Sequence, residues 1–276
     1  MFKNIIAYTK ELFSPSKSKK SSDRYVKTPR IIERDEHGID NRLVSLEAIR
    51  TVRNLQRAGY EAYVVGGAVR DLLLGVTPKD FDVVTDATPE QVKRCQKRAI
   101  IIGKRFRLVH VMFGRERIEC STFRALKGAG VRKDKFGRVI SDNVFGEMWE
   151  DAARRDFTIN ALYYNPSTEQ LIDYHNGMQD ILNGVVRMIG DPEERYREDP
   201  VRMLRAVRIA SKLKFTIDEE TLAPIGRLAP LLANVPEARL FDEAVKLLTC
   251  GRAIDCMEQL RHLGLYRNVI PLLEVA

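Results

Sequence analysis

With 276 residues the chain is long enough for one large or two ordinary domains, and its 44% hydrophobic and 30% charged content is typical of a globular protein. Four scattered cysteines and four isolated histidines argue against a disulfide framework and a zinc site, and they predict reduced thiols in a cytoplasmic protein. No apolar run is long enough to span a membrane.

The net charge of +8 is concentrated in residues 1–30, which hold eight lysines and arginines but only two acids. We expect residues 1–30 to form a basic flexible tail, either a tether to RNA or acidic lipid or simply a solvated segment. The opening residues are too few and too charged for a signal peptide. Their apolar side chains could line a weak amphipathic helix that associates with a membrane surface.

Apolar residues at helical spacing predict the first helix. Leu46, Ile49, Val52 and Leu55 would lie on its buried face, and Gly59 would end it.

Two acids follow the next apolar strand, within the stretch Tyr60–Val84. Asp80 and Asp82 are two residues apart, so in a strand their carboxylates would point to the same face. Like charges held together repel each other unless a cation lies between them. We therefore predict that Asp80 and Asp82 hold a hard divalent cation such as Mg²⁺.

Two glycines precede this acid pair. Gly66 and Gly67 would let backbone N–H groups approach phosphate oxygens at the start of a helix, where the helix dipole favours an anion. A tight strand-to-helix turn is the alternative explanation. The chain has neither the GxxxxGK[ST] pattern of a P-loop nor a GxGxxG pattern after a strand, so these two nucleotide-binding classes are disfavoured.

A second helix is predicted to start with Thr88 as its N-cap, Pro89 as its first residue and Gln91 in a capping box, and to run to about Arg98.

A hairpin of residues 107–113 and 117–123 follows. On its second strand Glu119 shares a face with Arg117 and Ser121, so an adjacent strand could bring Glu119 beside Asp80 and Asp82 as a third carboxylate.

Residues 126–143 are rich in glycine, lysine and arginine, and predict either a mobile basic loop over a substrate or an ordinary surface loop. Residues 159–164 and 171–174 predict another hairpin, and residues 185–189 a last strand. Because everything beyond has helical periodicity, we place a domain boundary near Gly190.

The most informative of the later helices begins at Asp199 and Pro200, as N-cap and first residue. Val201, Leu204 and Val207 would form its buried face.

Arg202, Arg205 and Arg208 recur at every third residue on a second face of the same helix. They predict a clamp for a triphosphate or for base edges, with a solvated basic face as the alternative. Further helices are predicted at 219–232, 240–248 and 253–263.

Four motifs occur in the order VVGGAVRDLLLG, KDFDVV, RRDFTINAL and EDPVRMLRAVRIA. Together they resemble the nucleotidyltransferase branch that contains bacterial poly(A) polymerases and class II CCA-adding tRNA nucleotidyltransferases. The resemblance extends from about residue 30 to the C-terminus. It implies an α+β fold, in which a nucleotidyltransferase head with a mixed or antiparallel sheet and flanking helices, residues 31–190, precedes an all-α neck, residues 191–276.

Two stretches favour the poly(A) polymerases within this branch, RIIERDEHGID at residues 30–40 and IIGKRFRLVHV at residues 101–111. The implied activity is template-independent transfer of AMP from ATP to RNA 3′ ends, which serves polyadenylation and RNA decay, with RNA-decay proteins among the partners. CCA addition to tRNA is the alternative.

The resemblance also implies a two-metal mechanism. Asp80 and Asp82 would hold two Mg²⁺ ions, one activating the RNA 3′-hydroxyl and one neutralising the triphosphate. The third acid would be Glu119 or Asp156, and Asp156 could instead hold the incoming ribose.

Nucleotide-binding residues are implied in two groups. The group that would contact the triphosphate and the sugar contains Gly66, Gly67, Arg70, Asp71, Arg154, Arg155 and Asn160, with Asp71 orienting Arg70 by an ion pair. The group on the neck, of which the first two residues would read the base and the others reach phosphates, contains Asp199, Arg202, Arg205 and Arg208.

Proteins of this family usually continue into body and tail domains that grip the RNA, and we expect these to be missing from a chain that ends at Ala276. A third interpretation is therefore a truncated, weakly active RNA-binding fragment, since phosphate contacts supply most non-specific RNA affinity.

Overall fold

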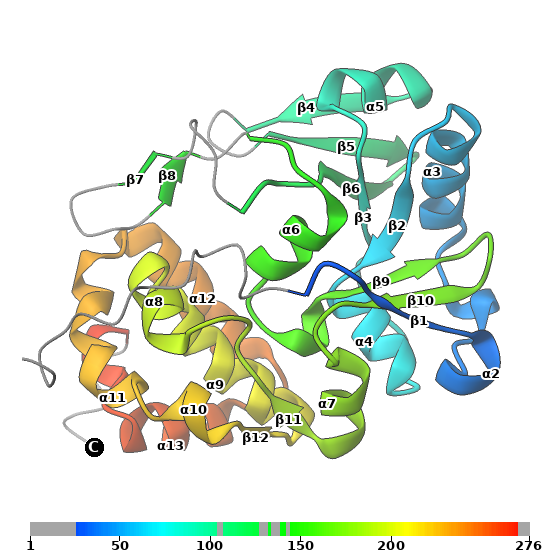
Figure 1. Cartoon of the computed structure of the whole chain (residues 1–276). Helices are drawn as coiled ribbons and strands as arrows, with labels where there is room; N and C mark the ends of the chain where they lie inside the picture. Colours follow the sequence, from blue (N-terminus) through cyan, green and yellow to red (C-terminus); the bar gives the residue numbers. More distant parts are fainter. Residues whose placement is uncertain (1–25, 104–106, 127–131, 134–138, 142–143, 270–276) are drawn as a thin grey trace, which may run out of the picture.

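The computed structural model describes residues 26–103, 107–126, 132–133, 139–141 and 144–269. Most of the predicted N-terminal tail and most of the predicted 126–143 loop lie outside these residues. The described chain forms a large sheet with helices on both faces, followed by a group of helices (Figure 1). Within these residues, no helix has the length and apolar character needed to cross a membrane.

The large sheet is mixed, and its eight strands follow the order β1-β10-β9-β2-β3-β6-β5-β4. Only β3 and β6 are parallel neighbours in this sheet, and all its other neighbouring strands are antiparallel. The strands are β1 (Arg30–Ile32), β2 (Ala62–Val65), β3 (Asp82–Thr85), β4 (Ala99–Ile102), β5 (Leu108–Phe113), β6 (Glu116–Thr122), β9 (Leu162–Asn165) and β10 (Gln170–Asp173).

One face of the sheet packs against α3 (Leu46–Arg57) and α5 (Pro89–Cys95). On the other face, α6 (Met148–Arg154) contributes to a cluster with side chains of β2, β3 and β9. The remaining helices of the first half are α2 (Arg34–His37), α4 (Gly67–Leu73) and α7 (Gly177–Asn183), with 3-10 turns at η2 (Asn41–Leu43) and η3 (Thr158–Asn160). The predicted head architecture is confirmed.

The two predicted helices of this half differ from expectation in detail. In α3, Ile49, Val52 and Leu55 are buried as predicted, but Leu46 is 63% exposed because it occupies the first turn. The capping box of α5 forms between Thr88 and Gln91 as predicted.

The helix α5 nevertheless ends at Cys95, three residues before the predicted end at Arg98. The chain becomes extended at Gln96, whose buried amide donates to the carbonyl oxygen of Thr51 at 3.1 Å. A contact to a distant part of the chain therefore ends this helix.

Both predicted hairpins form, as β5–β6 and β9–β10. The predicted strand at 185–189 is shorter, because only β11 (Val185–Val186) is a strand there, and it pairs with β12 (Thr216–Ile217) in a separate parallel pair. The second half is consequently not all helical. A third, antiparallel pair joins β7 (Arg132–Lys133) and β8 (Val139–Ser141).

The second half packs around α9 (Val201–Leu213), whose residues Val201, Leu204 and Val207 are buried as predicted. Pro200 rather than Asp199 is its N-cap, so the helix begins one residue later than expected. Its other elements are α8 (Pro192–Glu198), α10 (Glu219–Leu222), α11 (Ile225–Leu228), η4 (Ala229–Asn234), α12 (Glu237–Thr249), α13 (Ala253–His262) and η5 (Tyr266–Asn268).

The single helix predicted at 219–232 is wrong, since α10, α11 and η4 occupy this stretch. Pro224 and Pro230 explain the breaks, because proline has no N–H to donate within a helix.

Candidate active site

Two acids lie opposite each other in the parallel pair of β3 and β6. Asp82 is the first residue of β3 and lies directly opposite Glu119 of β6, so both side chains project from the same face of the sheet. Asp80 lies two residues before the strand starts, so the prediction that it shares the strand with Asp82 is wrong. The chain pairs with β2 only from Asp82 onward.

The carboxyl of Asp82 reaches the surface, but protein atoms crowd it. Loss of hydration, together with repulsion from Glu119 and Asp80, raises its pKa to about 6, while the positive charge of Arg155 opposes the shift. Negative charge therefore accumulates at this edge beyond what the neighbouring arginine balances.

The donor set of the acid site is suited to a hard divalent cation. Among the described residues, no group of three or more histidine, cysteine, aspartate or glutamate side chains is arranged to hold an ion. Asp80, Asp82 and Glu119 nevertheless offer only carboxylate oxygens, which are the donors that Mg²⁺ prefers. The repulsion that raises the pKa of Asp82 is also what a divalent cation would relieve.

His110 is a neighbour of the acid site that the sequence did not single out. It lies opposite Glu119 in the β5–β6 pair, and its Nε2 is 3.3 Å from Oε1 of Glu119. The predicted turn of residues 114–116 is one residue too long, since β6 begins at Glu116, and for this reason the predicted hairpin did not reveal the contact.

The two predicted glycines lie between β2 and α4. Gly66 has φ +81°, a left-handed conformation that a residue with a side chain rarely adopts, and a Cβ there would lie 3.5 Å from Nη1 of Arg155. Gly67 begins α4, and its Cβ position is 3.4 Å from Nη2 of Arg70. The turn therefore places backbone directly beneath two arginines.

Arg70 is buried and held from two sides. Its Nη2 lies 2.6 Å from Oδ1 of Asp71, the ion pair expected from the sequence, and its Nη1 donates to Oδ1 of Asn160 at 2.6 Å. Lys212 of α9 approaches Oδ2 of Asp71 at 3.7 Å. Arg70 and Asn160 are 90 residues apart, and their contact joins two of the sequence motifs.

Arg155 is held by two residues that the sequence analysis missed. Its guanidinium bonds to Oδ2 of Asp151 at 3.1 Å and to the hydroxyl of Tyr163 at 3.1 Å, and that hydroxyl donates to the same Asp151 oxygen at 2.9 Å. Burial alone would lower the pKa of Arg155, but Tyr163 and Asp151 outweigh it and raise the pKa. Asp151 precedes Arg155 by four residues, a spacing that could have revealed the pair in a helix.

The neighbouring Arg154 points elsewhere. Its Nη1 donates to the carbonyl oxygen of Ala125 at 3.2 Å, and burial, reinforced by Arg124 and Arg195, lowers its pKa to about 9. Arg195, also missed by the sequence analysis, donates to the carbonyl oxygen of Arg155 at 2.7 Å. Arg154 and Arg195 therefore bond to main-chain carbonyl oxygens, and Arg195 supports the RRDFTINAL motif through the backbone of Arg155.

Asp156 faces the neck instead of the acid pair. Its Oδ2 accepts from Nε of Arg205 at 2.8 Å, and its Oδ1 accepts from the Phe157 N–H at 2.8 Å and from the Asn160 amide at 3.2 Å. Burial would raise its pKa, but Arg205 and these donors hold the pKa well below its ordinary range. Of the two candidate third acids, only Glu119 therefore lies beside Asp82.

The neck residues are each engaged with a partner. Arg202 donates to the carbonyl oxygen of Arg195 at 2.8 Å, and burial lowers its pKa to about 10. Arg208 pairs with Glu243 at 2.6 Å.

Asp199 is an unusual member of the neck group. Its Oδ2 lies 2.7 Å from Nη2 of Arg239, while its Oδ1 is buried without a hydrogen-bond partner within the described part of the chain. The clamp predicted from the three arginines is thus spread over several ion pairs.

Two family models match this chain. One, described as the poly A polymerase head domain, matches residues 62–187, which contain the acid pair, the glycine turn and Arg155. The other, described as a probable RNA and SrmB-binding site of polymerase A, matches residues 214–276. The chain belongs to the nucleotidyltransferase family of bacterial poly(A) polymerases.

Relatives within this family include poly(A) polymerase I of Salmonella typhi, which is 48% identical over 280 residues. That alignment covers 98% of this chain but 60% of the relative, so the chain spans less than two thirds of this poly(A) polymerase. A CCA-adding enzyme of Enterococcus faecalis is more distant, with 40% identity over 202 residues that cover 73% of this chain and 48% of the relative.

The chain also resembles solved structures of CCA-adding enzymes. The CCA-adding enzyme of Bacillus stearothermophilus in complex with CTP aligns with a TM-score of 0.69 and 36% identity, over 79% of this chain and 52% of that one. The predicted recognition of the family and of its nucleotidyltransferase head is confirmed, and the poly(A) polymerases are the nearer relatives in sequence.

Proposed function

We propose that this chain transfers AMP from ATP to RNA 3′ ends without a template. The observation that carries the proposal is the direct pairing of Asp82 with Glu119 beside the glycine turn. The greater sequence similarity to poly(A) polymerase I than to a CCA-adding enzyme supports adenylate as the transferred group.

In this proposal Asp80, Asp82 and Glu119 hold Mg²⁺, with Glu119 as the third acid. The bound ions would supply activation of the RNA 3′-hydroxyl and neutralisation of the triphosphate charge. The support is the all-carboxylate donor set and the raised pKa of Asp82.

The nucleotide would lie over the glycine turn. Gly66 and Gly67 would allow close approach of the phosphates, and Arg70 and Arg155 would bind them. Because Asp71 and Asn160 already hold Arg70, and Asp151 and Tyr163 already hold Arg155, neither arginine would need to reorganise when ATP binds.

The neck residues have distinct proposed roles. Asp199, with its unpartnered Oδ1, and Arg202 would read the base edge by hydrogen bonds. Asp156 and Arg205 would fix the head, residues 31–190, against the neck, residues 191–276. Arg208, paired with Glu243, would support the same contact. Arg154, which donates to the carbonyl oxygen of Ala125, would support the neighbouring phosphate-binding residue Arg155.

The wider setting is also part of the proposal. We infer that RNA and RNA-decay proteins bind residues in the matched 214–276 region. A cytoplasmic location is supported by four free cysteines, two of which, Cys250 and Cys256, share a hydrogen bond between their sulfurs at 3.5 Å and form no disulfide.

CCA addition to tRNA is the second candidate, and the similarity to a CCA-adding enzyme in complex with CTP favours it. The test offers Mg²⁺ with ATP or CTP singly to a generic RNA oligonucleotide and to a tRNA lacking its 3′ end. We expect a ladder of added A on the generic RNA. Glu119→Gln should abolish the ladder, while Glu116→Gln, an exposed acid on the same strand, should retain it.

Other outcomes separate the alternatives. CTP incorporation confined to the tRNA would replace the proposal with CCA addition. RNA retention in a gel shift without any nucleotide addition would support the interpretation as an RNA-binding fragment.

A further inference from the structure

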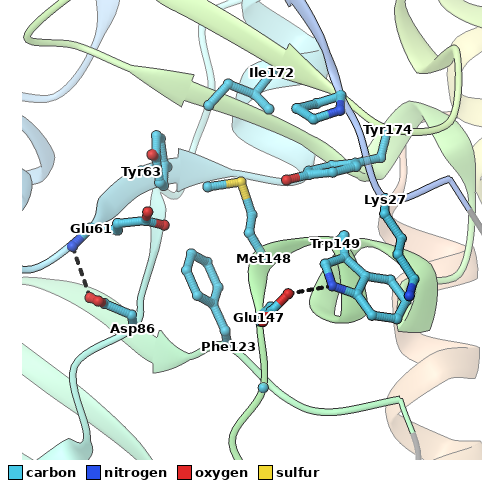
Figure 2. Close-up of a pocket in the computed structure, with 12 residues that line it drawn as sticks. Lys27, Glu61, Tyr63, Asp86, Phe123, Glu147, Met148, Trp149, Ile172 and Tyr174 are labelled. Carbon is cyan, nitrogen blue, oxygen red and sulfur yellow. Dashed lines mark hydrogen bonds between the residues drawn. The ribbon is translucent and has the colours of Figure 1, made fainter.

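A concave surface lies on the same face of the sheet as Asp82, but at the other end of the β2–β3 pair. Val65 opposes Asp82 at one end of the pair, and Ala62 opposes Thr85 at the other. Beyond Thr85, a pocket of about 580 Å³ opens between β2, β10 and the start of α6 (Figure 2). Its volume is that of a small-molecule site.

The walls of this pocket are aromatic. Tyr63, Phe123, Trp149 and Tyr174 line it, and the rings of Tyr63 and Phe123 stack with centroids 6.5 Å apart. Beneath them lies Tyr163, whose ring contacts those of Tyr63, Phe123 and Tyr174 at 6.4–6.5 Å. The faces of such rings carry partial negative charge and attract cations.

Three carboxylates stand at two positions around these rings. Glu61 and Asp86 lie at one wall, where Asp86 accepts from the Glu61 N–H at 2.8 Å, and Glu147 lies beside Trp149 at the other (Figure 2). Within the described residues, no lysine or arginine forms an ion pair with any of these three acids. Loss of hydration, followed by repulsion from Asp86, raises the pKa of Glu61.

An ammonium group already occupies part of the pocket. Nζ of Lys27 lies 5.0 Å from the ring centroid of Trp149, within the range of a cation–π contact. Lys27 is an exposed side chain, so a competing cation could displace it. One ammonium does not balance three carboxylates, and the opposite wall with Glu61 and Asp86 has no cation from the described chain.

We propose that this pocket binds an aliphatic polyamine. One ammonium would lie at Glu61 and Asp86, another would replace Lys27 at Trp149, and the methylene stem would cross the aromatic wall between them. A nucleotide or RNA would instead bring phosphates against three carboxylates, so the charge disfavours it. The inference is independent of the proposed AMP transfer.

The test uses the fluorescence of Trp149, which is the only tryptophan of the chain. Spermidine is titrated into the whole protein at constant ionic strength, and we expect a saturable change. The double variant Glu61→Gln, Asp86→Asn should weaken spermidine binding by about tenfold or more, since it removes charge-assisted contacts. The control Glu258→Gln, an exposed acid on α13, should leave the Kd unchanged.

A second variant, Lys27→Ala, tests the competition directly and changes only an exposed side chain. It should strengthen spermidine binding, because it removes the ammonium that already occupies Trp149. This arm remains decisive even if the double variant does not fold.

Several results would overturn the inference. These are the absence of a saturable change, an equal change on adding NaCl, undiminished binding by the folded double variant, and unchanged or weaker binding by Lys27→Ala. A change with oligoadenylate that the double variant strengthens would assign the pocket to RNA instead.

Discussion

Replacing Asp156 by asparagine tests whether this acid holds the head to the neck or takes part in the reaction. The carboxylate of Asp156 is 10% exposed and accepts hydrogen bonds from Arg205, Phe157 and Asn160. Asparagine keeps the shape of the side chain but removes its charge, so Arg205 loses its partner at the interface.

The size of the effect follows from the burial of the pair. Removing one partner of a buried ion pair costs about 3–5 kcal/mol. Because the Arg205 side chain is 34% exposed, water recovers part of this cost, and we expect a loss of about 2–3 kcal/mol. In a chain of this size that loss corresponds to a Tm roughly 4–12 °C lower.

The pH dependence has a defined sign. Since the pKa of Asp156 is lowered in the folded protein, the pair stabilises the fold above the ordinary value of 3.8 and loses its effect as the pH falls below it. The difference in Tm between parent and Asp156→Asn should therefore be full at pH 7 and shrink in acid.

Thermal unfolding and AMP transfer are measured together for Asp156→Asn and Glu119→Gln. We expect Asp156→Asn to lower Tm and to retain measurable transfer at saturating ATP. Glu119→Gln should keep or raise Tm, because it removes repulsion from Asp82, yet abolish transfer. The reasoning fails if Asp156→Asn leaves Tm unchanged and abolishes transfer, since Asp156 would then be the third acid.

Two further changes probe the site. In the absence of divalent metal, Asp82→Asn should have a higher Tm than the parent above pH 6. This difference in Tm should close toward pH 4, because the raised pKa means that Asp82 destabilises the fold only when it is ionised. Thermal scans in which Mg²⁺ fails to narrow the difference in Tm at pH 7 would contradict this. Tyr163→Phe should raise the KM for ATP by about tenfold with little change in kcat, since Arg155 and Asp151 lose the hydroxyl that bonds both. An unchanged KM in steady-state kinetics would refute that role.

Local chemistry made part of the fold predictable from the sequence. The capping box of Thr88 and Gln91 depends on residues three apart, and it forms as expected. The possibility that Glu119 lies beside Asp82 came from the period-2 alternation of a strand in a predicted hairpin, and this hairpin forms with a turn one residue shorter than predicted. The same alternation did not apply to Asp80, because the strand starts after it. The strand propensity of the residues does not determine where pairing with β2 begins.

The rest of the site depends on contacts between distant residues. Asp156 and Arg205 are 49 residues apart, and nothing in either motif alone indicates that they pair. The bond from Arg155 to Tyr163 likewise required the position of β9 beneath α6. A sequence motif identifies which residues take part, but the packing of helices against the sheet decides which of them touch.

The arginines of α9 have a consequence for how RNA affinity responds to salt. Arg202, Arg205 and Arg208 each lie against a carboxylate of Glu198, Asp156 or Glu243. A guanidinium that already has a carboxylate partner causes the release of few counterions when it binds a phosphate. An unpaired guanidinium releases almost one counterion, and so adds almost one to the slope of log affinity against log salt concentration. Along this helix the stripe of positive charge in the sequence is thus close to neutral in the folded protein, and its contribution to RNA affinity should vary little with ionic strength.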